Sequence, residues 1–258
     1  MNNNFTMRTS LLMGEENMNK LKNSHVLVIG VGGVGSFCVE ALVRAGIGNI
    51  TIVDYAKVEE SDFNRQLPGL ISNLNKEKVE VVKNRLLDIN KDLKIKAINC
   101  VFNEESSDKI FSENYDYVVD AIDMVSSKLH LIELCINKNI PIISSMGMGN
   151  KLDPTKIEIN DISKTHTCPL AKVMRKELRD RGIEHLKVVF STEQPIEVKE
   201  KISNGHRILP GSMSFMSSCG GLIMSSQVIK DLLGIKWFKI QNKNSNNLCV
   251  KKIITIFI

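Results

Sequence analysis

Short apolar runs alternate along the first half of the chain with segments whose apolar positions recur at the spacing of a helix. Residues 25–30 (HVLVIG) and 49–54 (NITIVD) are apolar runs typical of buried strands, and residues 34–45 carry apolar and small side chains at the helical period. A strand, a glycine turn, a helix and a second strand form a parallel pair with a right-handed crossover. The fold is therefore predicted to begin with a β-α-β unit.

The same alternation continues to about residue 150. The periodicity predicts helices over 76–90 and 126–139 and strands over 92–100, 115–123 and 140–145. Strands that alternate with helices over this length are typical of a doubly wound α/β sheet. We expect a Rossmann-like, mostly parallel sheet with helices on both faces.

The pattern changes after residue 150. Strands are predicted over 156–162 and 186–192, with a helix over 169–182 between them. Residues 211–229 then contain no charged residue, six Ser and three Gly. This segment is long enough to span a bilayer, but its Ser and Gly content favours a helix packed in the core. A membrane-associated helix is the alternative.

No repeat or low-complexity linker divides the 258 residues, so a single domain is expected over 1–258. Within this domain we expect a core over 25–150, a C-terminal elaboration over 151–234 and a variable tail over 235–258.

The composition is that of an ordinary globular protein, with 43% hydrophobic and 24% charged residues. A net charge of +5 permits a polyanionic partner without requiring one. The six cysteines form no C-x-x-C pair, which argues against a structural zinc site and a disulfide framework. Residues 1–17 lack the apolar run of a signal peptide, so a cytoplasmic location is expected.

A glycine-rich turn follows the first predicted strand. Gly30, Gly32 and Gly35 match G-x-G-x-x-G between a strand and a helix, where backbone amides at the helix N-terminus can bind phosphate. Asp54 ends the second strand, at the position expected for an acid that binds a ribose. These residues favour a bound nucleotide, but they do not distinguish a redox dinucleotide from ATP.

Three further charged residues favour ATP. Arg65 and Lys78 follow the second strand, and Asp123 follows a later one, so the three can converge at the carboxyl ends of the strands. Two cations and a carboxylate around a triphosphate are typical of phosphoryl or nucleotidyl transfer. A nicotinamide-dependent oxidoreductase and a non-catalytic nucleotide-binding adaptor are the less favoured alternatives.

These stretches resemble the ubiquitin-activating superfamily of adenylyltransferases. The resemblance is carried by GVGGVGS (30–36), ITIVD (50–54), NRQ (64–66), KVE (78–80) and DAID (120–123). Within that superfamily the chain is similar to the tRNA threonylcarbamoyladenosine dehydratases as far as about residue 234. The closer similarity is carried by residues 8–30, 149–165, 168–179 and 187–195.

The resemblance implies ATP and Mg²⁺ as cofactors and assigns roles to individual residues. The nucleotide-binding residues implied are Gly30, Gly32, Gly33, Gly35, Asp54, Asn64, Arg65, Gln66 and Lys78. The catalytic residues implied are Arg65, Lys78, Asp123 and Arg8. Asp123 would hold Mg²⁺, and Arg8 would reach the ATP of the neighbouring subunit in a homodimer. One position departs from the family pattern, because Asp62 stands where the first Asn of N-x-N-R-Q is usual. Its role is left open.

The reaction implied is ATP-dependent dehydration, or cyclisation, of threonylcarbamoyladenosine in tRNA through an acyl-adenylate. The alternative is activation of the C-terminus of a ubiquitin-like sulfur-carrier protein. The missing C-x-x-C pair counts against this alternative. A sulfur-relay or cysteine desulfurase protein is a candidate partner. Cys168 is the candidate for a reactive thiol, although a structural role is favoured for it.

The tRNA would need a surface of its own. The segment 164–182 is rich in basic side chains, namely Lys164, His166, Lys172, Arg175, Lys176, Arg179 and Arg181. Such a helix can contact tRNA phosphates. An ordinary solvated helix face explains the same pattern equally well.

Overall fold

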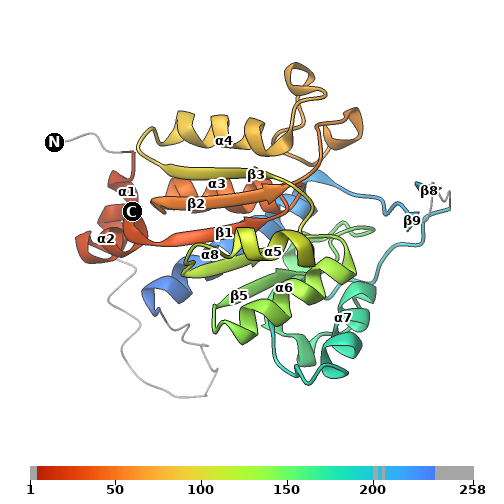
Figure 1. Ribbon diagram of the computed structural model, residues 1–258. Coiled ribbons are helices and arrows are strands. Elements are labelled where there is room, and N and C mark those ends of the chain that lie inside the picture. The colour runs from red at the N-terminus through yellow and green to blue at the C-terminus, as the bar shows by residue number, and fades with distance from the viewer. Residues whose placement is uncertain (1–4, 200–202, 205–206, 236–258) are drawn as a thin grey trace, which may run out of the picture.

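The computed structural model describes residues 5–199, 203–204 and 207–235. Its centre is a seven-stranded sheet with the order β3-β2-β1-β4-β5-β7-β6 (Figure 1). The strands are β1 (His25–Ile29), β2 (Asn49–Asp54), β3 (Lys94–Asn99), β4 (Tyr117–Asp120), β5 (Ile142–Ser145), β6 (Ile157–Asp161) and β7 (Lys187–Ser191). All neighbouring pairs are parallel except β6 and β7. The predicted doubly wound, mostly parallel α/β sheet is confirmed.

Helices cover both faces of this sheet. One face packs against α3 (Gly35–Ala45), α4 (Lys78–Ile89) and α8 (Ser214–Leu233), and the other against α5 (Glu104–Ile110), α6 (Val125–Asn137) and α7 (Pro169–Arg179). Four short 3₁₀ turns connect elements, namely η1 (Glu60–Asp62), η2 (Ile71–Asn73), η3 (Pro154–Lys156) and η4 (Ile162–Lys164). A two-stranded ribbon, β8 (Ser203–Asn204) with β9 (Arg207–Ile208), projects from the body (Figure 1).

The strand β1 shows why the central strands are continuously apolar. Val26 and Val28 are buried on the side of α3, and Leu27 and Ile29 are buried on the side of α6. Successive side chains of a strand point to opposite faces, so a strand covered on both sides needs apolar residues at every position. Each fully buried aliphatic side chain contributes about 1.5–3 kcal/mol.

The uncharged segment forms α8 and packs in the core against α3. Its buried face includes Ser217, Gly220 and Gly221. A Cβ at Gly221 would lie 2.3 Å from the Val34 carbonyl oxygen, so glycine is required for the two helices to cross this closely. None of the helices in the described ranges is long and apolar enough to cross a membrane. The preference for a core helix over 211–229 therefore holds.

The far end of α8 is fixed by a buried phenol. Tyr117 Oη donates a 2.6 Å hydrogen bond to Asp231 Oδ2, and Lys187 Nζ lies 2.5 Å from the same oxygen. Burial and the adjacent Asp231 carboxylate both raise the pKa of Tyr117 above its usual range. These contacts join α8 to the amino ends of β4 and β7.

Several elements were not predicted. Two helices, α1 (Met7–Met13) and α2 (Glu15–Asn23), precede the sheet, and the short α5 follows β3. The antiparallel direction of β6 also had no signal in the sequence, because a short apolar run carries no information on the direction of its partner. The variable tail lies outside the described residues except for Ile235.

Candidate functional site

The glycine turn lies where the carboxyl ends of β1 and β4 meet the N-terminus of α3. Gly30 has a φ of +87°, and a Cβ there would lie 2.6 Å from the Ala121 carbonyl oxygen. A Cβ at Gly35 would lie 1.8 Å from the Gly30 carbonyl oxygen. Only glycines therefore permit this turn, which brings the N-terminus of α3 and the end of β4 together.

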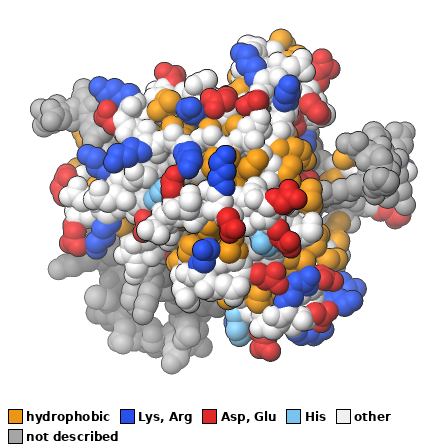
Figure 2. Space-filling model, viewed as in Figure 1, with side chains coloured by type: hydrophobic (Ala, Val, Ile, Leu, Met, Phe, Trp, Pro, Cys, Tyr) orange, Lys and Arg blue, Asp and Glu red, His pale blue; other side chains and the backbone are white. Residues whose placement is uncertain are grey.

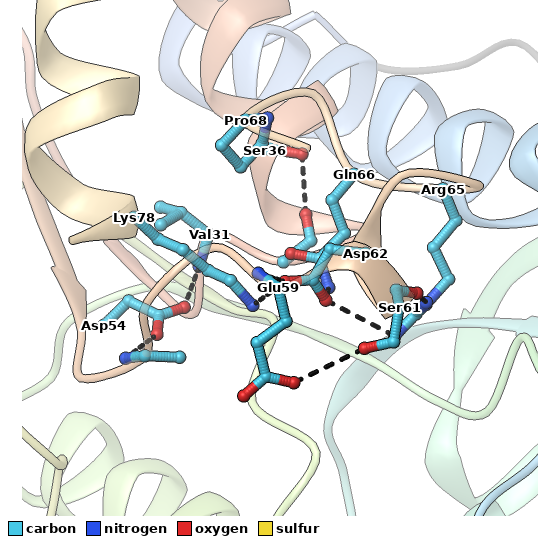
Figure 3. Close-up of polar contacts among 12 residues, drawn as sticks. Val31, Ser36, Asp54, Glu59, Ser61, Asp62, Arg65, Gln66, Pro68 and Lys78 are labelled. Atoms are coloured by element: carbon cyan, nitrogen blue, oxygen red, sulfur yellow. Dashed lines mark hydrogen bonds and ion pairs between the residues drawn. The ribbon is translucent and has the colours of Figure 1, made fainter. Parts of the chain in front are cut away.

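Asp54 joins the ends of β1 and β2. Its Oδ2 accepts a hydrogen bond from the Val31 amide at 2.8 Å, and its Oδ1 accepts one from the Ala56 amide at 2.8 Å (Figure 3). The carboxylate is half-buried beside the glycine turn. Each carboxylate oxygen retains further acceptor capacity, which a ribose hydroxyl can use.

Asp62, which stands where the family pattern usually has Asn, makes its contacts inside the protein. Its carboxylate points inward, where Oδ2 lies 2.9 Å from Lys78 Nζ and accepts a 3.0 Å hydrogen bond from the Glu59 amide (Figure 3). Asp62 is 4% exposed and Lys78 is 7% exposed. Asp62 thus holds the Lys78 ammonium in place at the start of α4.

The other residues of the NRQ stretch surround this pair. Arg65 Nη1 donates to the Ser61 carbonyl at 2.6 Å and to Asn64 Oδ1 at 2.9 Å, while its Nη2 lies 3.8 Å from Asp62 Oδ1 (Figure 3). Gln66 Nε2 donates to Asp62 Oδ1. Gln66 Oε1 is buried beside Gly32 and accepts no hydrogen bond from any residue that the structure describes. A buried acceptor without a donor at the glycine turn fits a site that receives a ligand.

The segment that leads into α8 closes one side of the site. Asn64 Nδ2 donates to the Ser212 carbonyl at 3.0 Å, and Ser217 Cβ would lie 3.1 Å from a Cβ at Gly33. Asn150 accepts a 2.6 Å hydrogen bond from the Gly211 amide. Residues far apart in the sequence are thus held against the glycine turn.

Asp123 is exposed on the turn between β4 and α6, beside the glycine turn. An ion pair that the sequence did not predict lies on either side of this turn, between Asp120 at the end of β4 and Lys128 on α6. Both side chains are fully buried. Lys128 occupies the helical spacing of Val125, Leu129 and Ile132, where an apolar residue is expected. A lysine on the apolar face of a helix was the available signal.

A third buried lysine follows β5. Lys151 is 2% exposed, and its Nζ donates to the carbonyls of Gly147 and Ser191, each at 3.2 Å. Burial lowers the pKa of Lys151, and the nearby Cys168 and Glu193 act in the opposite direction. Cys168 is itself 2% exposed at the N-terminus of α7, which agrees with the structural role favoured for it.

Arg8 lies away from this site. It is exposed on α1, and the preceding Thr6 packs beside Gly46, at the C-terminal end of α3 and the amino ends of the strands (Figure 1). The glycine turn is at the opposite end of α3. Arg8 therefore cannot act on the site of its own chain, which leaves only a second copy for the predicted role.

The residues present fit a magnesium ion bound with a nucleotide. No group of three or more His, Cys, Asp or Glu side chains within the described ranges could hold a metal by itself. At phosphate sites Mg²⁺ is usually held by one or two carboxylates together with substrate phosphates and water. Asp123, exposed on the turn that follows β4, supplies a carboxylate that such a site could use.

A scan against family models matches residues 6–255 to the ThiF family. The chain belongs to the ThiF family. Among relatives, it is 44% identical over 237 residues to the tRNA threonylcarbamoyladenosine dehydratase of Bacillus subtilis (strain 168), covering 88% of this chain and 93% of that protein. The predicted resemblance is confirmed.

Solved structures of ThiF-type proteins agree with the fold. The Escherichia coli tRNA N6-threonylcarbamoyladenosine dehydratase in complex with AMP superposes with a TM-score of 0.81 at 32% identity, covering 88% of this chain and 93% of that chain. The same enzyme in complex with ATP gives a TM-score of 0.80 at 31% identity with the same coverage.

Proposed function

We propose that this ThiF-family chain is an enzyme that uses ATP to dehydrate threonylcarbamoyladenosine in tRNA through an acyl-adenylate. The main support is that Arg65 and Lys78 meet around Asp62 beside the glycine turn, at the carboxyl ends of the strands, where β4 ends shortly before Asp123. The relatives named tRNA threonylcarbamoyladenosine dehydratase give the substrate.

The reaction follows from the chemistry of a carboxylate. The threonyl carboxylate is a poor electrophile, because its leaving group would be oxide. Its attack on the α-phosphate of ATP forms an acyl-adenylate and releases pyrophosphate, after which AMP is a good leaving group. The neighbouring carbamoyl group then attacks the acyl carbon and closes a ring, with net loss of water. This second step is intramolecular, so it gains a large effective molarity and needs no enzyme nucleophile.

The cations stabilise the negative charge that develops on the leaving pyrophosphate. Asp62 fixes the Lys78 ammonium in place, and Arg65 exchanges its contact with the Ser61 carbonyl for a phosphate oxygen. Asp54 binds the ribose, and Gly32, Gly33 and Gly35 let the phosphates approach the backbone. Mg²⁺, when bound, neutralises triphosphate charge, and Asp123 is the carboxylate that would hold it.

The same proposal includes a homodimer. On α1, Leu11 is 83% exposed and Leu12 is 79% exposed, so the helix presents an apolar surface beside Arg8. A second copy would cover this surface and receive Arg8 at its nucleotide site. Because tRNA is the substrate, we place the enzyme in the cytoplasm. A sulfur-relay or cysteine desulfurase protein remains a candidate partner.

The helix α7 offers a contact for tRNA. Lys172, Lys176 and Arg179 are spaced along one side of α7, all are exposed, and none of them has a carboxylate within ion-pair distance among the described residues. We call these three residues the α7 cationic stripe. Two other basic residues of the segment are already bound, since Arg175 donates to the Thr165 carbonyl and Arg181 pairs with Glu133 and Glu177. Acidic and basic side chains are interspersed over the face shown in Figure 2, including the lower-right region where Figure 1 places α7.

The function is tested by pyrophosphate release from Mg²⁺-ATP with purified protein. We expect release with threonylcarbamoyl-modified tRNA and loss of water from the modified nucleoside. Arg65→Ala and Asp123→Ala should each lower the rate by about 100-fold or more with the fold unchanged. Release that depends on a sulfur-carrier protein instead would favour the alternative reaction.

Mixing of variants tests the dimer in the same assay. Arg8→Ala keeps a complete nucleotide site, and Arg65→Ala keeps a donor of Arg8. Each should be inactive alone, and co-expression should restore part of the activity, because one site in a mixed dimer is complete. Two variants that stay inactive together would exclude the shared site.

A further inference from the structure

The turn that carries Asp123 is held from beneath by a buried network. Lys128 Nζ on α6 lies 2.9 Å from Asp120 Oδ2 at the end of β4 and donates to the Ile122 carbonyl at 3.0 Å. Asp120 Oδ1 accepts a hydrogen bond from the Ile122 amide at 3.1 Å. Ser144 on β5 donates to Asp120 Oδ2 at 2.6 Å. Both polar groups of Ile122 are therefore held by side chains that pair with each other.

We propose that the Asp120–Lys128 pair is a positioning device that fixes the backbone from which the Asp123 side chain extends, so that its carboxylate is held in one place for Mg²⁺. The proposal rests on the proposed function only in assigning Asp123 to Mg²⁺. The Ile122 carbonyl belongs to the peptide bond that leads into Asp123, so the Lys128 contact fixes the backbone of that residue directly.

The location of the turn supports this role. The Ala121 amide donates to the Ile29 carbonyl at 2.9 Å, and the Ala121 carbonyl oxygen packs against Gly30. Residues 121–124 thus form one turn, in which Ala121 contacts the glycine turn and Ile122 is hydrogen-bonded to Asp120 and Lys128. Asp123 is the next residue of this turn. A shift of the turn would move the carboxylate relative to the phosphates.

Packing alone does not account for the pair. Both side chains are 0% exposed, and well-packed apolar residues fill such a volume with equal or greater stability, because burying two charges costs desolvation. An ion pair with three further hydrogen bonds instead fixes one geometry. Residues that orient a metal ligand in this way commonly change metal affinity when they are replaced.

The test compares three variants in ATP binding by calorimetry, with Mg²⁺ and with a chelator. The double variant Asp120→Asn/Lys128→Met removes the charges together and leaves no unpaired ion. Ser144→Ala is a milder change to the same network, and it keeps the test open if the double variant does not fold. Tyr117→Phe is the matched control, because it loses one buried hydrogen bond at the other end of β4.

The measured quantity is the gain in ATP affinity that Mg²⁺ provides. We expect this gain to be about 10-fold smaller in the double variant than in the wild type, and to be reduced less in Ser144→Ala. The ATP affinity without Mg²⁺ should stay within about 2-fold of the wild type in both variants. Tyr117→Phe should keep the full gain. Hydrogen exchange of the 121–124 amides should be faster in the double variant and unchanged in the control.

An unchanged Mg²⁺ gain in the folded network variants would overturn the proposal. So would an equal loss of affinity with and without Mg²⁺, since that result describes general damage to the site. The two proposals fail separately. If the wild type releases no pyrophosphate with modified tRNA yet the Mg²⁺ gain depends on the network, the proposed function fails and the positioning role stands.

Discussion

The crossing of α3 and α8 gives the sharpest prediction of stability. In Gly221→Ala the new Cβ would lie 2.3 Å from the Val34 carbonyl oxygen and 2.9 Å from the Cys38 amide nitrogen. Both atoms belong to the backbone, so no side chain can move aside. The helices must separate by about 1 Å, and overpacking of this kind costs about 1–3 kcal/mol.

The neighbouring position supplies a matched control. In Gly220→Ala the nearest atoms belong to the flexible Met148 side chain, at 3.3–3.4 Å. Both substitutions gain about 1 kcal/mol of helix propensity, so this gain cancels when the two variants are compared. The overpacking cost remains, and Gly221→Ala should be about 2 kcal/mol less stable than Gly220→Ala. For a protein of this size, the Tm of Gly221→Ala should then lie roughly 4–8 °C below that of Gly220→Ala.

Thermal unfolding and urea denaturation of the two variants measure the difference. Gly221→Ala should also bind ATP more weakly, because Val34 immediately precedes the N-terminus of α3 at the phosphate turn. Gly221→Ala is expected to be destabilised by contact with the backbone of α3 and not by the loss of glycine itself. Equal unfolding midpoints for the two variants would refute this expectation.

Two further outcomes are expected. Replacing the α7 cationic stripe with alanines should reduce the slope of log K for tRNA binding against log salt concentration by about 2–3, and ATP binding should stay unchanged. The control is Lys91→Ala/Lys94→Ala, on the opposite edge of the sheet. An equal reduction of the slope in that control would contradict the assignment of α7 as the tRNA contact. Burial by itself raises the pKa of Glu40, but hydrogen bonds from Arg85 and Arg44 outweigh it and lower the pKa below its usual value. The pairing therefore stabilises the fold at neutral pH, and this contribution is lost as the pH falls through the lowered pKa. The gap in urea stability between wild type and Glu40→Gln should close from about pH 7 to about pH 3, and a constant gap would contradict this assignment.

Much of the candidate nucleotide site, namely the glycine turn and the place of Asp54, was predictable because its signals are local. The glycine turn between β1 and α3 needs a positive φ at Gly30 and a close approach of the backbone at Gly35, and both positions are marked in the sequence by glycine. Asp54 was predictable because the end of a strand has a fixed place in a β-α-β unit. These features depend on residues close together in the chain.

The partners of the charged residues were not predictable. Asp62 lies 16 positions before Lys78, and nothing in the sequence indicates that its carboxylate turns inward to meet that ammonium rather than facing the phosphates or solvent. The departure from the usual Asn could be seen, but its meaning depends on how the segment after β2 folds back onto α4.

The sequence by itself determined the alternation of strands and helices, the parallel sheet and the position of the phosphate turn, since periodicity and backbone conformation are set by neighbouring residues. Only the tertiary structure decided that Lys128 supports the turn before Asp123, that Gly221 lets α8 cross α3, and that Arg8 lies at the far end from its own site. These contacts join segments far apart in the chain. Their formation depends on close packing of the whole core, which leaves no periodic signal in the sequence.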